Sequence, residues 1–130
     1  MERVEQMKQT ATPIRAGIIG ATGYAGVELV RILLRHPHAE IAAISSVSFE
    51  GQPLWSVYPA LHAICDLTCE TAEAVIQKSD VVFAALPHGL SQQIAAKCIQ
   101  AGKAFVDLGA DFRLEDPEQY RQWYGCEVEY

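Results

Sequence analysis

The sequence lacks long apolar runs and a surplus of basic residues, and each absence excludes a class of protein. Its longest apolar stretches, such as residues 41–44 and 81–86, are far shorter than the ~20 residues of a membrane-spanning helix, and no apolar signal region follows the N-terminus. Ten Lys and Arg against 16 Asp and Glu give a formal charge of −6, which disfavours nucleic acid or an anionic membrane surface as a partner. We therefore expect a cytoplasmic protein that binds neither nucleic acid nor membrane.

Paired cysteines are also missing. Cys65, Cys69, Cys98 and Cys126 show neither the spacing of a zinc site nor that of a small disulfide scaffold, so reduced thiols are the simplest state. Cys65 and Cys69 could share a helix face, but no His or Cys pair accompanies them. The sequence therefore predicts no metal site.

The 130 residues, half of them apolar, are enough for a single domain with one core. Residues 1–13 are polar and aperiodic and end in Pro13, which predicts a flexible N-terminal extension. A transit peptide is the alternative, but such peptides avoid acidic residues and this segment contains Glu2 and Glu5. We assign the domain to residues 14–125 and expect residues 126–130 to begin a following segment.

Short apolar strands alternate with helical patterns throughout the domain. The pattern predicts strands at 14–19, 40–44, 67–69, 81–86 and 104–108. It predicts helices at 27–34, at 72–77 with Thr71 as the cap, at 91–100 and at 117–124. Residues 47–62 have no assignment. Strands that are apolar on both faces and alternate with helices imply an α/β fold, a Rossmann-type doubly wound parallel sheet covered on both sides.

A glycine-rich turn links the first strand to the first helix. Gly20 and Gly23 allow a sharp bend that approaches a pyrophosphate closely, next to the positive end of the helix dipole, and Gly26 lets the helix lie close to the sheet. The alternative is a tight turn whose glycines serve geometry alone. The position of the turn favours nucleotide binding, with the candidate residues Gly20, Ala21, Thr22, Gly23, Tyr24, Ala25 and Gly26.

The end of the second strand bears on which dinucleotide is bound. An NAD site usually has Asp or Glu there, to bind the ribose 2′-hydroxyl, whereas this chain has Ser45 and Ser46. Hydroxyls donate to a 2′-phosphate without the repulsion of a carboxylate, so NADP(H) is favoured. Against this, no arginine follows immediately and Glu50 is near.

Two more candidate sites follow later strands, where ligands bind in open α/β sheets. The segment Leu86-Pro87-His88-Gly89 is expected to line the nicotinamide side of the cleft, although His88 could merely belong to a turn that ends a strand. Arg113 could hold an anionic group of a substrate by paired hydrogen bonds. The alternative for Arg113 is an internal ion pair with Asp111, Glu115 or Asp116.

Several segments between residues 14 and 125 form a distinctive combination. They are the glycine turn with Val27-Glu28-Leu29-Val30-Arg31, then His36-Pro37-His38, Leu86-Pro87-His88-Gly89, Asp107-Leu108-Gly109-Ala110-Asp111-Phe112-Arg113-Leu114, and Tyr120 with Trp123-Tyr124-Gly125. Through this combination the chain resembles, over about residues 14–125, the N-terminal half of the N-acetyl-gamma-glutamyl-phosphate reductases, arginine-biosynthesis enzymes related to aspartate-semialdehyde dehydrogenases.

This resemblance implies reductive dephosphorylation of an acyl phosphate. A cysteine thiolate displaces phosphate, NADPH reduces the thioester, and a semialdehyde leaves. In that family the cysteine lies in an Asn-Pro-Gly-Cys-Tyr-Pro segment and the histidine comes later. Neither segment occurs here, and Cys126 lies in Gly125-Cys126-Glu127, which does not match.

We therefore expect no catalytic residue in this chain. The nucleophilic Cys and the His are expected downstream of Tyr130, in a C-terminal catalytic and dimerisation domain, so the chain alone is predicted to be inactive and the full-length enzyme a homo-oligomer. A related reductase of aspartyl phosphate or of the carrier-linked aminoadipyl phosphate of lysine synthesis is one alternative. A non-catalytic module that senses a dinucleotide is another.

Overall fold

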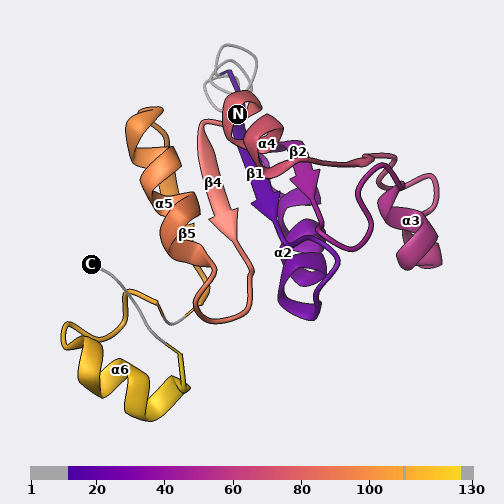
Figure 1. Cartoon of the computed structure of the whole chain (residues 1–130). Helices are drawn as coiled ribbons and strands as arrows, with labels where there is room; N and C mark the ends of the chain where they lie inside the picture. Colours follow the sequence, from indigo (N-terminus) through magenta and orange to yellow (C-terminus); the bar gives the residue numbers. More distant parts are fainter. Residues whose placement is uncertain (1–11, 110, 127–130) are drawn as a thin grey trace.

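A computed structural model describes residues 12–109 and 111–126 of the chain. The predicted extension lies almost entirely outside the described residues, as do residues 127–130 of the predicted following segment. Five parallel strands form one sheet in the order β3-β2-β1-β4-β5, which confirms the predicted doubly wound fold (Figure 1). The strands are β1 (Ile14–Ile19), β2 (Ala39–Ser45), β3 (Cys69–Glu70), β4 (Val81–Ala84) and β5 (Ala104–Asp107).

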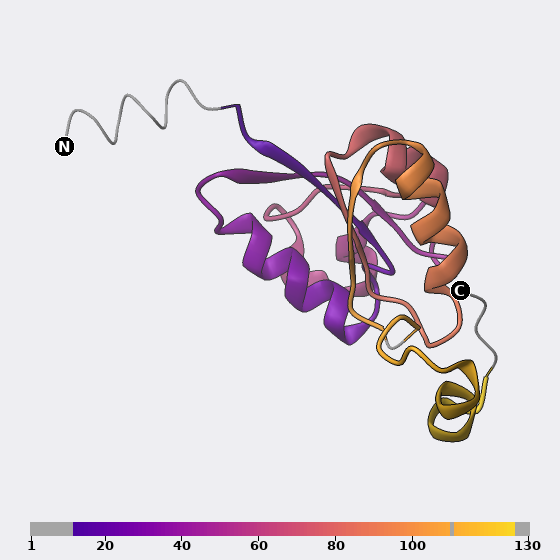
Figure 2. The ribbon, with the colours of Figure 1, turned by 90° about the vertical axis from the view of Figure 1, so that its left-hand side faces the viewer.

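Helices lie on both faces of this sheet. They are α2 (Tyr24–Leu34), α3 (Leu54–Val57), α4 (Ala72–Lys78), α5 (Ser91–Gln100) and α6 (Pro117–Tyr124), with a 3-10 turn η1 (Pro59–Leu61) after α3. Figure 2 shows α2 on one side of the sheet and α4 and α5 on the other. The helix α6 lies beyond the carboxyl ends of the strands (Figure 1 and Figure 2).

Each face of the sheet has its own apolar core. On one side, α2 buries Val27, Val30 and Leu33, at helical spacing, in a cluster that also contains Ile18 and Ile44. On the other side, α4 and α5 bury a cluster formed by Ile19, Ala43, Val75, Ile76, Val82 and Cys98. Burial on both sides holds the carboxyl ends of β1, β2 and β4 in fixed positions.

One face of the edge strand β5 is less covered than the centre of the sheet. Phe105 of β5 packs in the core under α4 and α5, whereas Val106, which points to the opposite face, is 40% exposed. The helix α2, which covers the same face of the sheet, packs mainly on β1 and β2. The apolar pattern of the sequence could not predict the exposure of Val106, since a valine fits the pattern of a strand whether or not a helix covers it.

Several element boundaries also differ from the prediction. The helix α2 begins at Tyr24 rather than at residue 27. Its first turn overlaps the glycine-rich segment and has exposed residues, so it shows no apolar helical pattern in the sequence. The helix α4 begins at Ala72, and the hydroxyl of Thr71 accepts from Ala74 N, which confirms Thr71 as its predicted cap. The strand predicted over 81–86 ends at Ala84. The segment 47–62 contains α3 and η1, which are too short to show a periodic pattern.

Candidate functional site

The carboxyl ends of β1, β2 and β4 meet where the strand order reverses. Gly20 N and Ala21 N both donate to the carbonyl of Ser45, at 3.1 and 3.0 Å, and Ala85 N donates to the carbonyl of Ile19 at 2.8 Å. The glycine turn after β1 and the turn after β4 are therefore neighbours. Such a switch point is the usual ligand-binding place of a doubly wound sheet.

The two outer glycines of the first turn are required by the fold itself. Gly20 has φ +87°, and a Cβ there would lie 2.3 Å from the carbonyl oxygen of Ala85. A Cβ on Gly26 would lie 2.1 Å from the carbonyl oxygen of Gly20. No side chain fits at either position without a backbone shift. The geometry of the turn is therefore enough to explain why Gly20 and Gly26 are glycines, without nucleotide binding.

Gly23 is different. It is exposed, its φ is −76°, and a Cβ there would meet nothing closer than the Gly20 carbonyl oxygen at 3.7 Å, an ordinary contact. Neither backbone strain nor packing therefore demands glycine here. Side chains at the N-cap position reach toward the first amides of a helix, so glycine at the N-cap of α2 leaves those amides uncovered.

The N-terminus of α2 offers free amides to an anion. Gly23 makes no side-chain cap and the first turn contains no acidic residue, while Tyr24 and Ala25 are exposed. In contrast, α4, α5 and α6 have first-turn amides that donate to Thr71, Asp111 and Asp116 respectively. The uncapped amides and the helix dipole give this end of α2 a partial positive charge that suits a phosphate group.

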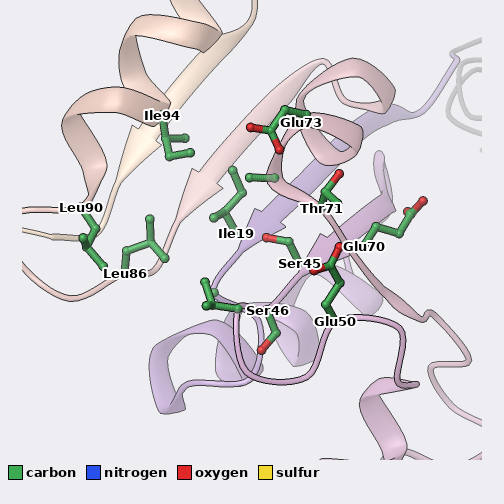
Figure 3. A pocket seen from close by; sticks show the side chains of 13 residues that line it. Ile19, Ser45, Ser46, Glu50, Glu70, Thr71, Glu73, Leu86, Leu90 and Ile94 are labelled. Atoms are coloured by element: carbon green, nitrogen blue, oxygen red, sulfur yellow. The ribbon is translucent and has the colours of Figure 1, made fainter.

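A cleft of about 380 Å³ opens beside the turn, between the end of β2 and the first turns of α4 and α5 (Figure 3). One wall is apolar and contains Ile19, Leu86 and Ile94. The other wall is polar and contains Ser45, Glu50 and Glu70. An apolar wall facing a few polar groups is typical of a site for a small molecule.

Both predicted serines line this cleft, but they do different things. The hydroxyls of Ser46 and Thr22 share a hydrogen bond of 2.8 Å, so Ser46 ties the end of β2 to the glycine turn. The side chain of Ser45 has no such partner among the described residues and lines the cleft. Of the two hydroxyls, that of Ser45 is the one available to a ligand.

Tyr58 is a residue of the site that the sequence did not reveal. Its hydroxyl donates to the carbonyl of Thr22 at 2.7 Å and so holds the middle of the glycine turn from outside. Tyr58 follows α3 inside the segment without predicted structure. Nothing in its local sequence indicated a contact 36 residues away.

The turn after β4 is held by a buried carboxylate. Asp111 is fully buried and accepts from Gly89 N at 2.6 Å, from Ser91 N at 2.9 Å and from the hydroxyl of Tyr120 at 2.8 Å. It thereby caps α5 and fastens α6 to it. The proposed ion pair between Arg113 and Asp111 is wrong, because these three donors surround the carboxylate.

The protonation states agree with this arrangement. Burial acts to raise the pKa of Asp111, but the hydrogen bonds from Gly89, Tyr120 and Ser91 outweigh it and hold that pKa below its usual value. Burial raises the pKa of Tyr120, and the contacts with Cys126 and Asp111 add to the rise. Asp111 is therefore an ionised acceptor and Tyr120 a neutral donor at neutral pH.

The predicted segment 86–89 divides between two places. Leu86 lines the cleft, whereas the exposed ring of His88 packs against the ring of Tyr124, with ring centroids 4.8 Å apart. Gly89 has φ +92° and lies against Cys126. The thiol of Cys126 in turn donates to the Tyr120 hydroxyl at 3.7 Å.

Arg113 lies away from the main cleft. It lines a separate hollow of about 220 Å³ with Asp107, Gly109 and Phe112, is exposed, and forms no ion pair within the described part of the chain. Asp107 accepts from Ser91 Oγ and Gly109 N through one oxygen, both at 2.8 Å. Its other oxygen is buried without a partner, so this hollow has an unused acceptor beside an unused cation.

The described residues also bear on metal binding, thiol reactivity and membrane insertion. Among residues 12–109 and 111–126, no group of His, Cys, Asp and Glu could hold a metal ion. Burial raises the pKa of the Cys98 thiol, and burial together with Cys65 raises that of Cys69. Within the same residues, no helix is both long and apolar enough to cross a membrane.

Comparison with known proteins places this geometry in context. Residues 15–129 match the family described as "Semialdehyde dehydrogenase, NAD binding domain". Similar curated proteins include the N-acetyl-gamma-glutamyl-phosphate reductases of Clostridium botulinum (strain Eklund 17B), 56% identical, and Clostridium beijerinckii, 53% identical, each over 86% of this chain. The chain spans about a third of the length of these relatives, since the matches cover 33% of each.

Solved structures agree on the fold. Aspartate semialdehyde dehydrogenase with NADP from Candida albicans has a TM-score of 0.70 at 26% identity, covering 82% of this chain and 32% of that one. A protein called RSP, solved with beta-NAD+ and operator DNA, has a TM-score of 0.61 at 17% identity over 90% of this chain and 54% of its own. At that identity the likeness extends to the fold alone.

Proposed function

The chain belongs to the family of semialdehyde dehydrogenase NAD-binding domains, and on that premise we propose that it is the cofactor-binding domain of an N-acetyl-gamma-glutamyl-phosphate reductase. The relatives at 53 and 56% identity support this substrate family. The single structural observation that carries the proposal is the open N-terminus of α2 behind Gly23, where the fold needs no glycine but a pyrophosphate would.

The cofactor we propose is NADP(H). Its pyrophosphate would lie on residues 20–26, its adenosine in the cleft beside Ser45, and its nicotinamide toward Leu86 and the turn that follows. The lack of an acid at the end of β2 supports the phosphorylated form, as does the NADP in the Candida albicans relative. The cofactor would supply the hydride, and this chain's residues would orient it.

In the complete enzyme we propose NADPH-dependent reductive dephosphorylation of N-acetylglutamyl 5-phosphate to the semialdehyde. We assign Arg113 to an anionic group of that substrate, because it is exposed and unpaired among the described residues. No residue of this chain is assigned the role of nucleophile. The cytoplasmic location and the homo-oligomeric state remain predictions.

A related substrate such as an aspartyl phosphate is the second candidate, favoured by the aspartate semialdehyde dehydrogenase neighbour at 26% identity. The unused charge at Arg113 suits either substrate. The part of the relatives that this chain does not span would decide between them.

The test is a titration of the chain with NADPH and NADH, followed by calorimetry or by nicotinamide fluorescence. We expect saturable binding of NADPH, at least as tight as that of NADH. We also expect no turnover of N-acetylglutamyl phosphate by this chain. Absence of binding would contradict the proposal, and measurable turnover would mean that Cys126 or another thiol acts as a nucleophile.

A further inference from the structure

The polar wall of the cleft carries negative charge and no cation. Glu50, Glu70 and Glu73 line it, and no Lys, Arg or His is among its described lining residues. The negative charges of two of these carboxylates are balanced by lysines that do not line the cleft. Glu70 pairs with Lys78, and Glu73 pairs with Lys97 at 2.7 Å. Glu50 forms neither an ion pair nor a hydrogen bond with any described residue, so it is the uncompensated charge of the cleft.

Glu50 is held at this place by its neighbours. Gly51 N donates to the carbonyl of Cys69 at 2.8 Å, and Cys69 N donates to the carbonyl of Gln52 at 2.9 Å. These bonds tie the loop to β3 on both sides of the turn, although Glu50 itself follows β2 by five residues. Figure 3 shows its carboxylate turned into the cleft, toward the part of the wall that Ser45 lines.

We infer that Glu50 opposes a 2′-phosphate at the adenosine end of the cleft, so that this chain accepts NADH nearly as well as NADPH. The inference rests on the proposed function. A carboxylate and a phosphate group of charge near −2 at about 6 Å repel each other by roughly 1.4 kcal/mol even at the dielectric constant of water, which is about tenfold in affinity. The 2′-hydroxyl of NADH carries no charge and can donate to a carboxylate, so it meets no such penalty.

Two features of the wall therefore act in opposite directions. The serine at the end of β2 removes the acid that usually selects NAD, and Glu50 restores a carboxylate to the same cleft from a later loop. The sequence places these residues five positions apart, and the fold brings both to one wall. The expected outcome is a small preference between the two cofactors.

The experiment measures dissociation constants for NADPH and NADH with the wild-type chain, Glu50→Gln and the control Glu40→Gln. Glu40 is exposed and lies near the amino end of β2, opposite the cleft, so its substitution changes the net charge equally. We expect wild-type constants within about tenfold of each other. Glu50→Gln is expected to tighten NADPH about tenfold and to change NADH by less than about twofold, while Glu40→Gln changes neither.

A second pair of ligands locates the effect. 2′,5′-ADP and 5′-AMP differ only by the 2′-phosphate, and Glu50→Gln should tighten the first alone. The gain should shrink as the salt concentration rises from about 0.05 to about 0.5 M. An unchanged NADPH constant in Glu50→Gln, or an equal change for both cofactors, overturns the inference and leaves the proposed function intact. Failure of wild type and variants to bind either cofactor overturns both.

Discussion

The turns after β1 and β4 are neighbours at the carboxyl ends of their strands, yet they are built in different ways. The first is fixed by the main chain, because neighbouring carbonyl groups occupy the space that a Cβ on Gly20 or Gly26 would need. The second is fixed by a side chain, Asp111, which comes 22 residues after Gly89. At the first turn, the leading amides of α2 stay open to an anion, although Gly20 N and Ala21 N donate to a main-chain carbonyl. The second turn uses its amides on an internal carboxylate. Of these two turns, the first is therefore the one with unpaired amides that suit an anion.

The largest effect is expected from Gly26→Ala. The new Cβ would lie 2.1 Å from the Gly20 carbonyl oxygen and 2.8 Å from the Cα of Ala21, so the turn or the helix must move. We expect a loss of about 3 kcal/mol or more in the free energy of unfolding, measured by urea denaturation. An unchanged midpoint would mean that the first turn is not fixed by its backbone.

Asp111→Ala should cost nearly as much in the second turn. It leaves two amides and a buried hydroxyl without their acceptor, which predicts a loss of about 2–4 kcal/mol in the same measurement. Asp116→Ala is the matched control, because Asp116 caps α6 from an exposed position and its loss should cost about 1 kcal/mol. Equal effects of the two substitutions would contradict the side-chain basis of this turn.

Gly23→Ala is expected to separate binding from folding. Its backbone suits alanine and its surroundings have room, so the stability should stay within about 1 kcal/mol of wild type or rise slightly. NADPH binding should weaken about tenfold or more, since the methyl group blocks the approach to the α2 amides. If both properties stay unchanged, Gly23 has no role in binding.

The smallest effect concerns pH. The pKa of Asp111 is lower in the folded chain than its usual value, so its stabilising contribution is present above about pH 4 and is lost as the pH falls through the folded pKa. The free energy of unfolding should therefore fall on acidification, and it should fall less steeply in Asp111→Asn than in wild type. Parallel pH profiles for the two proteins would count against an ionised Asp111.

The same contrast explains what the sequence could predict. The glycine turn, α5 and α6 follow from signals within a few residues, such as Asp116-Pro117 at the start of α6 and Gly125 at its end. The roles of Asp111 and Tyr58 depend on partners 20 to 36 residues away, which no local pattern contains. The exposure of Val106 on β5 could not be predicted for the same reason, because cover depends on where α2 lies.

The most direct test of the account follows the backbone amide signals of the chain by NMR during a titration with NADPH. The account predicts that the amides of Tyr24, Ala25 and Gly26 shift most and that those of Gly89 and Ser91, which already donate to Asp111, shift much less. Larger shifts at Gly89 and Ser91, with the first turn of α2 unchanged, would contradict it.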